Sequence, residues 1–186
     1  MKVAAPFLLV TALSSIAAAA QQPEFKPSAN PVNDAVRENL ARSSKNLVSA
    51  AELMPAEKYG YQPTSAQMTF GQLIAHIVQT NVALCSGISG TTAPMTPEEL
   101  KKLTGTDPKD SLVAAIKRSF DYCTEALSKV SDAQLAEEAS MFGRRTGQSR
   151  GMMLVTIAND WADHYSTAAG YLRLNSILPP TAQPKK

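Results

Sequence analysis

The sequence holds few of the residues that most often carry catalysis: its 186 residues include two histidines and two cysteines. Aromatic residues make up 6% of the chain, and the alternating Val, Ile and Thr runs typical of half-buried strands are missing. No phosphate-binding loop, dinucleotide-binding glycine pattern or Ser-His-Asp constellation is visible. Together with many Ala and Leu residues, these gaps favour a single all-α domain.

The sequence also lacks a large excess of charge of either sign, because it has 18 Lys and Arg residues and 16 Asp and Glu residues. Such a balance argues against a surface dedicated to nucleic acid or to an anionic membrane. We therefore expect no nucleic-acid partner, and no membrane partner once the N-terminal segment has been removed. A small-molecule ligand of unknown identity and a homodimer remain open.

The N-terminal segment has the pattern of a secretory signal peptide. Lys2 is followed by an apolar run over 3–18, which closes on small residues up to Ala20. A transmembrane anchor is the alternative, but the run is near the short end for spanning a bilayer and no charge follows it. We predict cleavage after Ala20 and export to the periplasm or the medium. The expected division of the chain is a signal peptide (1–20), a flexible segment (21–30), a helical bundle (31–180) and a disordered tail (181–186).

Four long segments carry the spacing of amphipathic helices, and each begins at a helix-start signal. The connection between the second and third segments is about 18 residues long, and its capping box, Thr96 to Glu99, predicts a short helix through Leu103. A connection of this length permits the second and third helices to run parallel. The four helices are predicted to begin at Asn30–Pro31, Thr69, Asp107–Pro108 and Ser149, and to end before Pro55, at Gly90, near Val130 and near Leu174.

The two cysteines bear on whether those helices are parallel. Cys85 lies 16 residues after Thr69, and Cys123 lies 16 residues after Asp107, so each lies about 24 Å along its helix. In parallel helices the two would be level and a disulfide feasible, whereas in an antiparallel hairpin they would be offset by more than about 10 Å. Two buried free thiols are the alternative. An oxidising destination favours the disulfide.

Both histidines lie within predicted helices. His76 lies on a flank of its apolar face, toward a seam between helices. Asp160 and His164 are four residues apart and point the same way, on the inward face of the fourth helix, where an ionisable pair needs a partner or a metal. A direct Asp160–His164 hydrogen bond is one interpretation. The other is a divalent metal held by His76, Asp160 and His164, because imidazole nitrogens and a carboxylate oxygen suit zinc and related ions.

Two segments around these residues resemble the DinB-like superfamily. They are FGQLIAH at 70–76 and DWADHY at 160–165, the latter followed by YLRLN at 171–175. The resemblance implies a four-helix bundle in up-down-down-up order. It also implies a metal site of three histidines, one on the second helix and an H-x3-H pair on the fourth. His76 and His164 match the first and last of these, and Asp160 stands at the middle position. We therefore expect a divalent metal, zinc or nickel, as the cofactor.

Two classes of function remain open. The resemblance implies metal-dependent hydrolase or transferase chemistry, in which the ion activates water or a thiolate. Known thiol cofactors are intracellular, which weighs against the transferase for an exported protein. The alternative is a non-catalytic exported bundle that binds a small ligand or a protein partner and has a degenerate metal site, because Asp160 stands where the family usually has histidine.

Two further features allow more than one interpretation. Three arginines between residues 143 and 150 either bind an anion beside the start of the fourth helix or lie in a flexible, solvated loop. Trp161 and Tyr165 flank the candidate ligands. They either line a substrate cleft or belong to the core, as large aromatic residues usually do.

Overall fold

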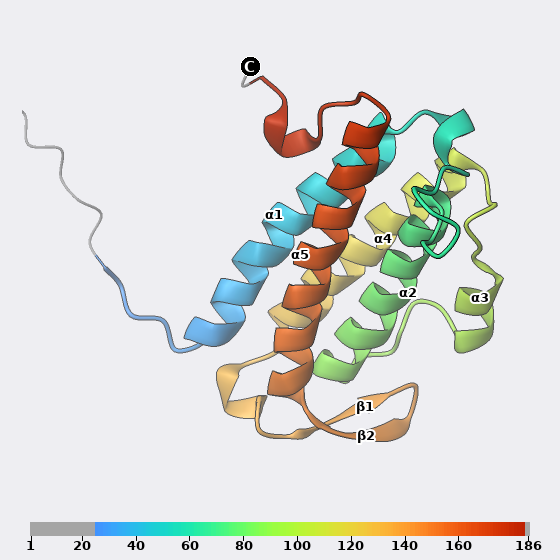
Figure 1. The fold of residues 1–186 in the computed structure, drawn as a ribbon. Helices are drawn as coiled ribbons and strands as arrows, with labels where there is room; N and C mark the ends of the chain where they lie inside the picture. The colour runs from blue at the N-terminus through green and yellow to red at the C-terminus, as the bar shows by residue number, and fades with distance from the viewer. Residues whose placement is uncertain (1–24, 185–186) are drawn as a thin grey trace, which may run out of the picture.

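The computed structural model describes residues 25–184. The predicted signal peptide and its cleavage after Ala20 lie outside the described residues, as does the end of the predicted tail. Among residues 25–184, the chain forms five α-helices and one two-stranded sheet, joined by three short 3-10 turns (Figure 1). The elements are α1 (Pro31–Leu53), η1 (Ala56–Lys58), α2 (Phe70–Ser89), α3 (Pro97–Lys102), α4 (Lys109–Ser128), η2 (Asp132–Gln134), β1 (Glu138–Met141), β2 (Arg144–Ser149), α5 (Arg150–Leu174) and η3 (Pro180–Ala182).

The four long helices share one hydrophobic core. α1 and α2 each pack against both α4 and α5, and Figure 1 shows the β1–β2 hairpin lying across one end of this group. Burying a large apolar side chain stabilises a fold by roughly 1.5–3 kcal/mol, so these contacts dominate its stability. Within residues 25–184, no helix is long and apolar enough to cross a membrane. The largest fully buried side chains include Leu40, Leu47, Phe70, Ile74, Ile77, Leu112, Ile116, Phe120, Leu127 and Trp161.

Several predicted helix ends are confirmed. Thr69 caps α2 in a reciprocal pair of hydrogen bonds with Gln72, and α2 ends at Gly90 with a positive φ of 72°, as helices commonly do. Ser149 caps α5 through its hydroxyl. The short helix α3 begins at the predicted capping box of Thr96. These signals are local, and therefore the sequence alone could place them.

One predicted cap, Asp107, is wrong, and another, Asn30, is confirmed in position but does not cap through its side chain. α4 begins at Lys109, two residues after Asp107, whose carboxylate accepts a hydrogen bond from the Thr104 amide. Asn30 occupies the capping position of α1 but its side chain makes no capping hydrogen bond. In both cases the side chain accepts a hydrogen bond from a backbone amide outside the helix that it precedes.

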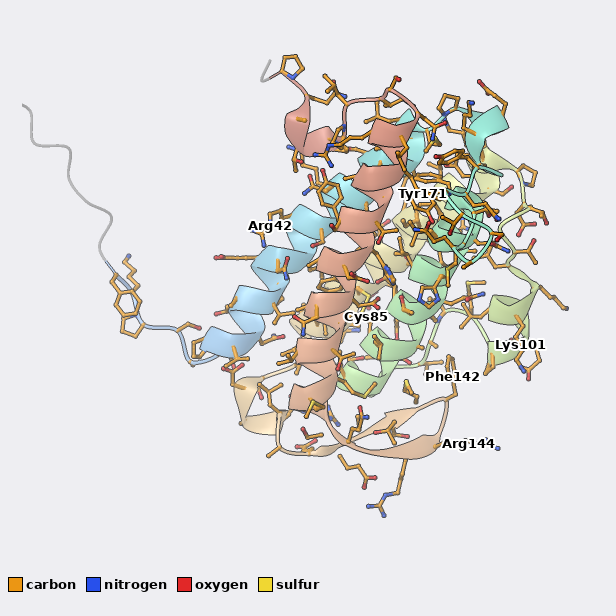
Figure 2. All side chains as sticks on the ribbon, in the orientation of Figure 1. Arg42, Cys85, Lys101, Phe142, Arg144 and Tyr171 are labelled. Carbon is orange, nitrogen blue, oxygen red and sulfur yellow. A yellow bond between two sulfur atoms is a disulfide. The ribbon has the colours of Figure 1, made fainter. Side chains whose placement is uncertain are left out.

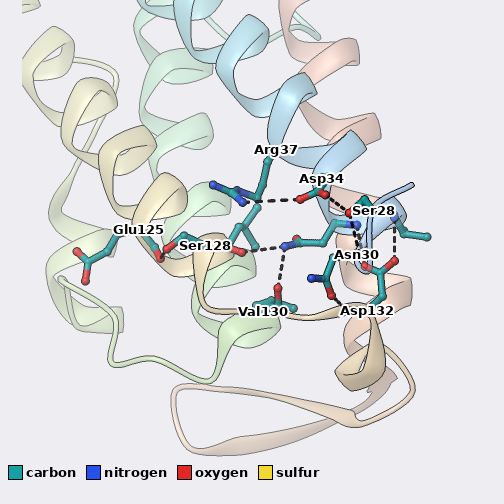
Figure 3. A network of polar contacts seen from close by, with 11 residues as sticks. Ser28, Asn30, Asp34, Arg37, Glu125, Ser128, Val130 and Asp132 are labelled. Carbon is teal, nitrogen blue, oxygen red and sulfur yellow. Dashed lines mark hydrogen bonds and ion pairs between the residues drawn. The ribbon is translucent and has the colours of Figure 1, made fainter. Parts of the chain in front are cut away.

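The cap of α1 comes from Asp132, about one hundred residues further along the chain. Its carboxylate accepts hydrogen bonds from the amides of Val32, at 2.8 Å, and Asn33, at 2.9 Å. In return, the Asn30 side chain accepts from the Asp132 amide at 2.9 Å (Figure 3). The buried Asn33 side chain donates to two main-chain carbonyl groups at and beyond the end of α4. The start of α1 and the segment after α4 therefore stabilise each other.

The hairpin departs from the predicted all-α fold and replaces the flexible loop expected around the arginines. β1 and β2 are antiparallel, and Met141 pairs with Arg144. The two residues between them, Phe142 and Gly143, have positive φ values of 49° and 76°, as a type I′ turn requires. Glycine adopts this conformation readily, but a bulky side chain does so at a cost. The strands are too short and too polar for an alternating pattern to reveal them.

The predicted disulfide between Cys85 and Cys123 is present. Their Cα atoms lie 5.3 Å apart, and both residues are fully buried between α2 and α4; Figure 2 labels Cys85. One turn earlier on each helix, Asn81 donates a hydrogen bond to Ser119 at 3.0 Å. Going from the Asn81–Ser119 pair to the Cys85–Cys123 pair, the residue number increases along both helices. α2 and α4 therefore run parallel where they meet.

The crossover between α2 and α4 lies backbone to backbone against the start of α2. A Cβ atom added at Gly71 would lie 2.2 Å from the Gly105 carbonyl oxygen. One added at Gly105 would lie 2.3 Å from the Gln72 amide nitrogen. Contacts this close cannot be relieved by rotating a side chain, so both positions require glycine.

Replacing Gly71 by alanine is expected to lower the free energy of unfolding by about 1–3 kcal/mol, because the crossover backbone must move to admit the methyl group. Gly170→Ala is the matched control. Gly170 also lies within a helix, but an added Cβ would meet nothing within 4 Å, and the change should be neutral or stabilise by up to about 1 kcal/mol. Urea unfolding measures both. Equal effects of the two changes would contradict the close contact.

Candidate metal centre

α2 and α5 bring together the three side chains singled out from the sequence. His76 comes from α2, and Asp160 and His164 lie one turn apart on α5. Each offers one ligand atom, and the three atoms lie within 4.8 Å of one another. The two imidazole rings meet edge to face, with their centroids 5.0 Å apart. A single ion could contact all three side chains after small rotations.

Asp160 and His164 are close without forming a regular hydrogen bond. His164 Nε2 lies 3.2 Å from Asp160 Oδ1, and the side chains are 12% exposed for His164 and 22% exposed for Asp160. Among the described residues, His164 Nε2 and Asp160 Oδ2 are buried atoms with no hydrogen-bond partner. Buried polar atoms normally have partners. The cluster therefore fits a bound cation, which would serve as the missing partner of both atoms.

The surroundings shift the pKa of two of the three groups. Burial lowers the pKa of His76, the neighbouring His164 lowers it further, and Asp160 partly offsets both. Burial raises the pKa of the Asp160 carboxyl, but His164, Thr80 and His76 together outweigh burial and hold it below its usual value. His76 is thus kept neutral and Asp160 ionised, which are the forms that bind metal ions.

Trp161 belongs to the core, and Tyr165 is tied to the C-terminal segment. The Trp161 side chain is fully buried, and its indole nitrogen donates to Asn81 Oδ1 at 2.7 Å. The Tyr165 hydroxyl donates to Thr181 at 2.8 Å. Both polar groups are already engaged, so neither is a free group for binding a substrate.

A hollow of about 350 Å³ opens beside His76. One wall comes from α2 and the other from the crossover, which sequence reasoning did not connect with the site. The close contact between Gly71 and Gly105 holds this wall in place, and contacts between residues distant in the chain leave no local sequence signal. The hollow is lined by Met68, Gln72, Ala75, His76, Gln79, Leu103, Thr104 and Gly105.

The three arginines between residues 143 and 150 lie outside this cluster, and two of them have acidic partners. Arg145 pairs with Glu138 across the hairpin, and Arg150 pairs with Glu137 at 3.1 Å. In the part of the chain that the structure describes, no ion pair involves Arg144. Two of the three charges are therefore used to hold the hairpin and the start of α5.

Comparison with known proteins places this arrangement in a family. The DinB superfamily matches residues 39–168, and no curated protein matches the sequence. A DinB-like protein from Bacillus cereus ATCC 10987 is similar in structure, with a TM-score of 0.63 and 16% identity over 79% of this chain and 95% of the other. A DinB-like protein from Bacillus subtilis gives a TM-score of 0.60 and 20% identity over 81% and 99%.

A third similar structure is a variant of the mycothiol-dependent maleylpyruvate isomerase. Its TM-score is 0.57, with 17% identity over 72% of this chain and 59% of the isomerase. At these identities the likeness concerns the fold. The family match covers well over half of the sequence, including all three residues of the His and Asp cluster. The chain belongs to the DinB superfamily.

Proposed function

We propose that this protein holds a divalent metal ion between His76, Asp160 and His164 and acts on a small molecule at that ion. The proposal rests on three ligand atoms, one from each side chain, that lie within 4.8 Å of one another. Asp160 and His164 each also have a buried polar atom without a hydrogen-bond partner among the described residues. Two imidazoles and a carboxylate suit zinc, and nickel also accepts them. Three protein ligands leave a coordination position open for water or substrate.

A metal held there would supply Lewis-acid chemistry and a more acidic bound water. The residues of this chain position and tune the ion: Asp160 contributes the single negative charge, and burial keeps His76 neutral. Metal-assisted hydrolysis or group transfer is the reaction class that this set supports. The hollow beside His76 is the side from which a substrate would approach.

We also infer an exported protein whose four long helices follow the order up-down-down-up. Three long-range contacts support this order: Asn33 of α1 with the end of α4, the disulfide between α2 and α4, and Tyr171 of α5 with Met68 just before α2. The disulfide suits an oxidising compartment. The signal-peptide pattern over residues 1–20 supports export independently of the fold.

One observation favours a second candidate, a non-catalytic binding module. His164 Nε2 already lies 3.2 Å from Asp160 Oδ1, so a small rotation would turn the contact into a direct hydrogen bond. The pair would then partly satisfy itself without an ion. In that case His76 would line a ligand hollow and bind no metal.

Metal titration of the purified protein separates the two candidates. We expect about one zinc or nickel ion per chain, with a higher melting temperature on binding. Asp160→Asn should weaken binding by at least about tenfold, since it removes the only charged ligand. Asp163→Asn is the matched control, because Asp163 is an exposed carboxylate on the same helix, and it should leave the affinity unchanged.

Two results would contradict metal binding at this cluster. One is substoichiometric metal after reloading with zinc or nickel. The other is an equal loss of affinity in Asp160→Asn and Asp163→Asn, which would indicate nonspecific binding by surface carboxylates. Either result would leave the non-catalytic module as the surviving candidate.

A further inference from the structure

A second hollow lies away from the metal cluster, between the hairpin and the crossover. It has a volume of about 660 Å³, within the range of small-molecule sites. One side is formed by α3, and the other by the turn and β2. Figure 2 shows Phe142 at the turn of the hairpin, with Lys101 on α3 and Arg144 on β2 to either side. The lining residues are Pro97, Glu98, Lys101, Met141, Phe142, Arg144, Arg145, Thr146 and Gln148.

Phe142 is an unusual residue for its position. Its φ is +49°, where a type I′ turn normally has Asn, Asp or Gly, and yet 39% of the residue is exposed. Together with Pro97 it also lines an adjoining hollow of about 410 Å³. An aromatic side chain placed at a conformational cost and left partly uncovered presents a flat apolar surface to a ligand.

The charges around Phe142 define the ligand further. Arg145 is paired with Glu138, whereas no ion pair involves Lys101 or Arg144 within the described residues. Against these two cations stands Glu98 on the same rim, so the hollow has one positive charge in excess. A guanidinium and an ammonium suit a carboxylate, which can accept two hydrogen bonds from the arginine.

We propose that this hollow, lined by Phe142, Arg144 and Lys101, binds a small monocarboxylic acid with a flat apolar body. The apolar body packs on Phe142 and Pro97, and the carboxylate lies between Arg144 and Lys101. Gln148 lines the same hollow and offers a neutral polar side chain. The proposal is independent of the metal cluster, with which it shares no residue.

Titration of the protein with 2-naphthoate, followed by amide NMR shifts, tests the proposal. We expect saturable binding with the largest shifts in residues 98–101 and 141–148. The neutral analogue 2-naphthalenemethanol should bind at least about tenfold more weakly, because it lacks the charge. Equal binding of acid and alcohol, shifts centred on other residues, or no saturation up to about 10 mM would overturn the proposal.

Phe142→Asn distinguishes a ligand surface from a structural side chain. Asparagine suits the positive φ, so we expect an unchanged or higher melting temperature together with at least about tenfold weaker naphthoate binding. A lower melting temperature with unchanged binding would show that Phe142 serves the fold, and would overturn its proposed role.

Charge variants test the carboxylate contacts. Arg144→Gln and Lys101→Gln should each weaken naphthoate binding by about tenfold and leave 2-naphthalenemethanol binding unchanged. Lys102→Gln is the matched control, since Lys102 lies on α3 beside Lys101 but does not line the hollow, and it should have no effect. An equal effect of all three changes would show that naphthoate responds only to the net charge of the protein, and would contradict the proposal. So would binding of an acidic peptide to these residues without naphthoate binding.

Discussion

Replacing both Cys85 and Cys123 by alanine should lower the free energy of unfolding by about 4 kcal/mol. The disulfide links residues 38 apart in sequence, and closing a loop of that length removes much of the conformational freedom of the unfolded chain. Both residues are fully buried, so the lost packing adds to this effect. In a chain of this size the melting temperature should fall by about 10 °C or more.

Urea unfolding of the double variant and of the unmodified protein, each with and without reductant, measures this change in the free energy of unfolding. Reductant should destabilise the unmodified protein and leave the double variant unchanged. A count of free thiols before and after reduction provides an independent measurement. If reductant has no effect on the unfolding midpoint of the unmodified protein, the linkage does not constrain its unfolded state.

Replacing Asn81 by leucine should lower the free energy of unfolding by about 3 kcal/mol. Asn81 is fully buried. Its side-chain oxygen accepts a hydrogen bond from the Trp161 indole at 2.7 Å, and its side-chain nitrogen donates one to Ser119 at 3.0 Å. Leucine has a similar volume but bonds to neither partner. The indole N–H would remain buried without an acceptor, which is the costly outcome for a polar group in a core.

A double-mutant cycle with Trp161→Phe isolates the contact between Asn81 and Trp161. Phenylalanine removes the indole N–H, so the double variant no longer leaves that donor unpaired. We expect its loss of stability to be smaller than the sum of the two single losses by about 1 kcal/mol or more. Strict additivity would show that the hydrogen bond contributes little and that the single effects arise from packing.

The bundle could be predicted largely because its signals are local. Thr69, Gly90 and Ser149 each bound a helix through contacts within four residues, and helical spacing marked the buried faces between them. The disulfide was predictable from the equal distances of Cys85 and Cys123 along their helices. These inferences needed only the regular rise of an α-helix.

The features that escaped prediction either depend on contacts between distant parts of the chain or lack a local sequence signal. The cap of α1 comes from Asp132, and Asn30 offered a plausible local alternative with the correct residue type. The hairpin gave no alternating pattern, and its turn has Phe142 where asparagine or glycine would have been the signal. The sequence favoured a core position for Trp161 over a cleft, but it could not show the hydrogen-bond partner of the indole, because Asn81 lies 80 residues away.

The three residues of the candidate metal cluster could be predicted from the sequence, but the wall beside His76 could not. The spacing of Asp160 and His164, together with the family resemblance, indicated the three side chains that the structure brings together. The wall formed by the crossover beside His76 depends on the approach of Gly105 to Gly71. Nothing in the sequence around either glycine distinguishes that contact from an ordinary loop.

The long-range cap of α1 also means that the start of this helix can be completed only late in synthesis of the chain. The amides of Val32 and Asn33 leave the ribosome about one hundred residues before Asp132, their acceptor. Until then these two amides can be bonded only to water, and the nascent helix frays at that end. A fragment ending before residue 132 would retain this frayed end permanently, even though it contains all of α1, α2 and α4.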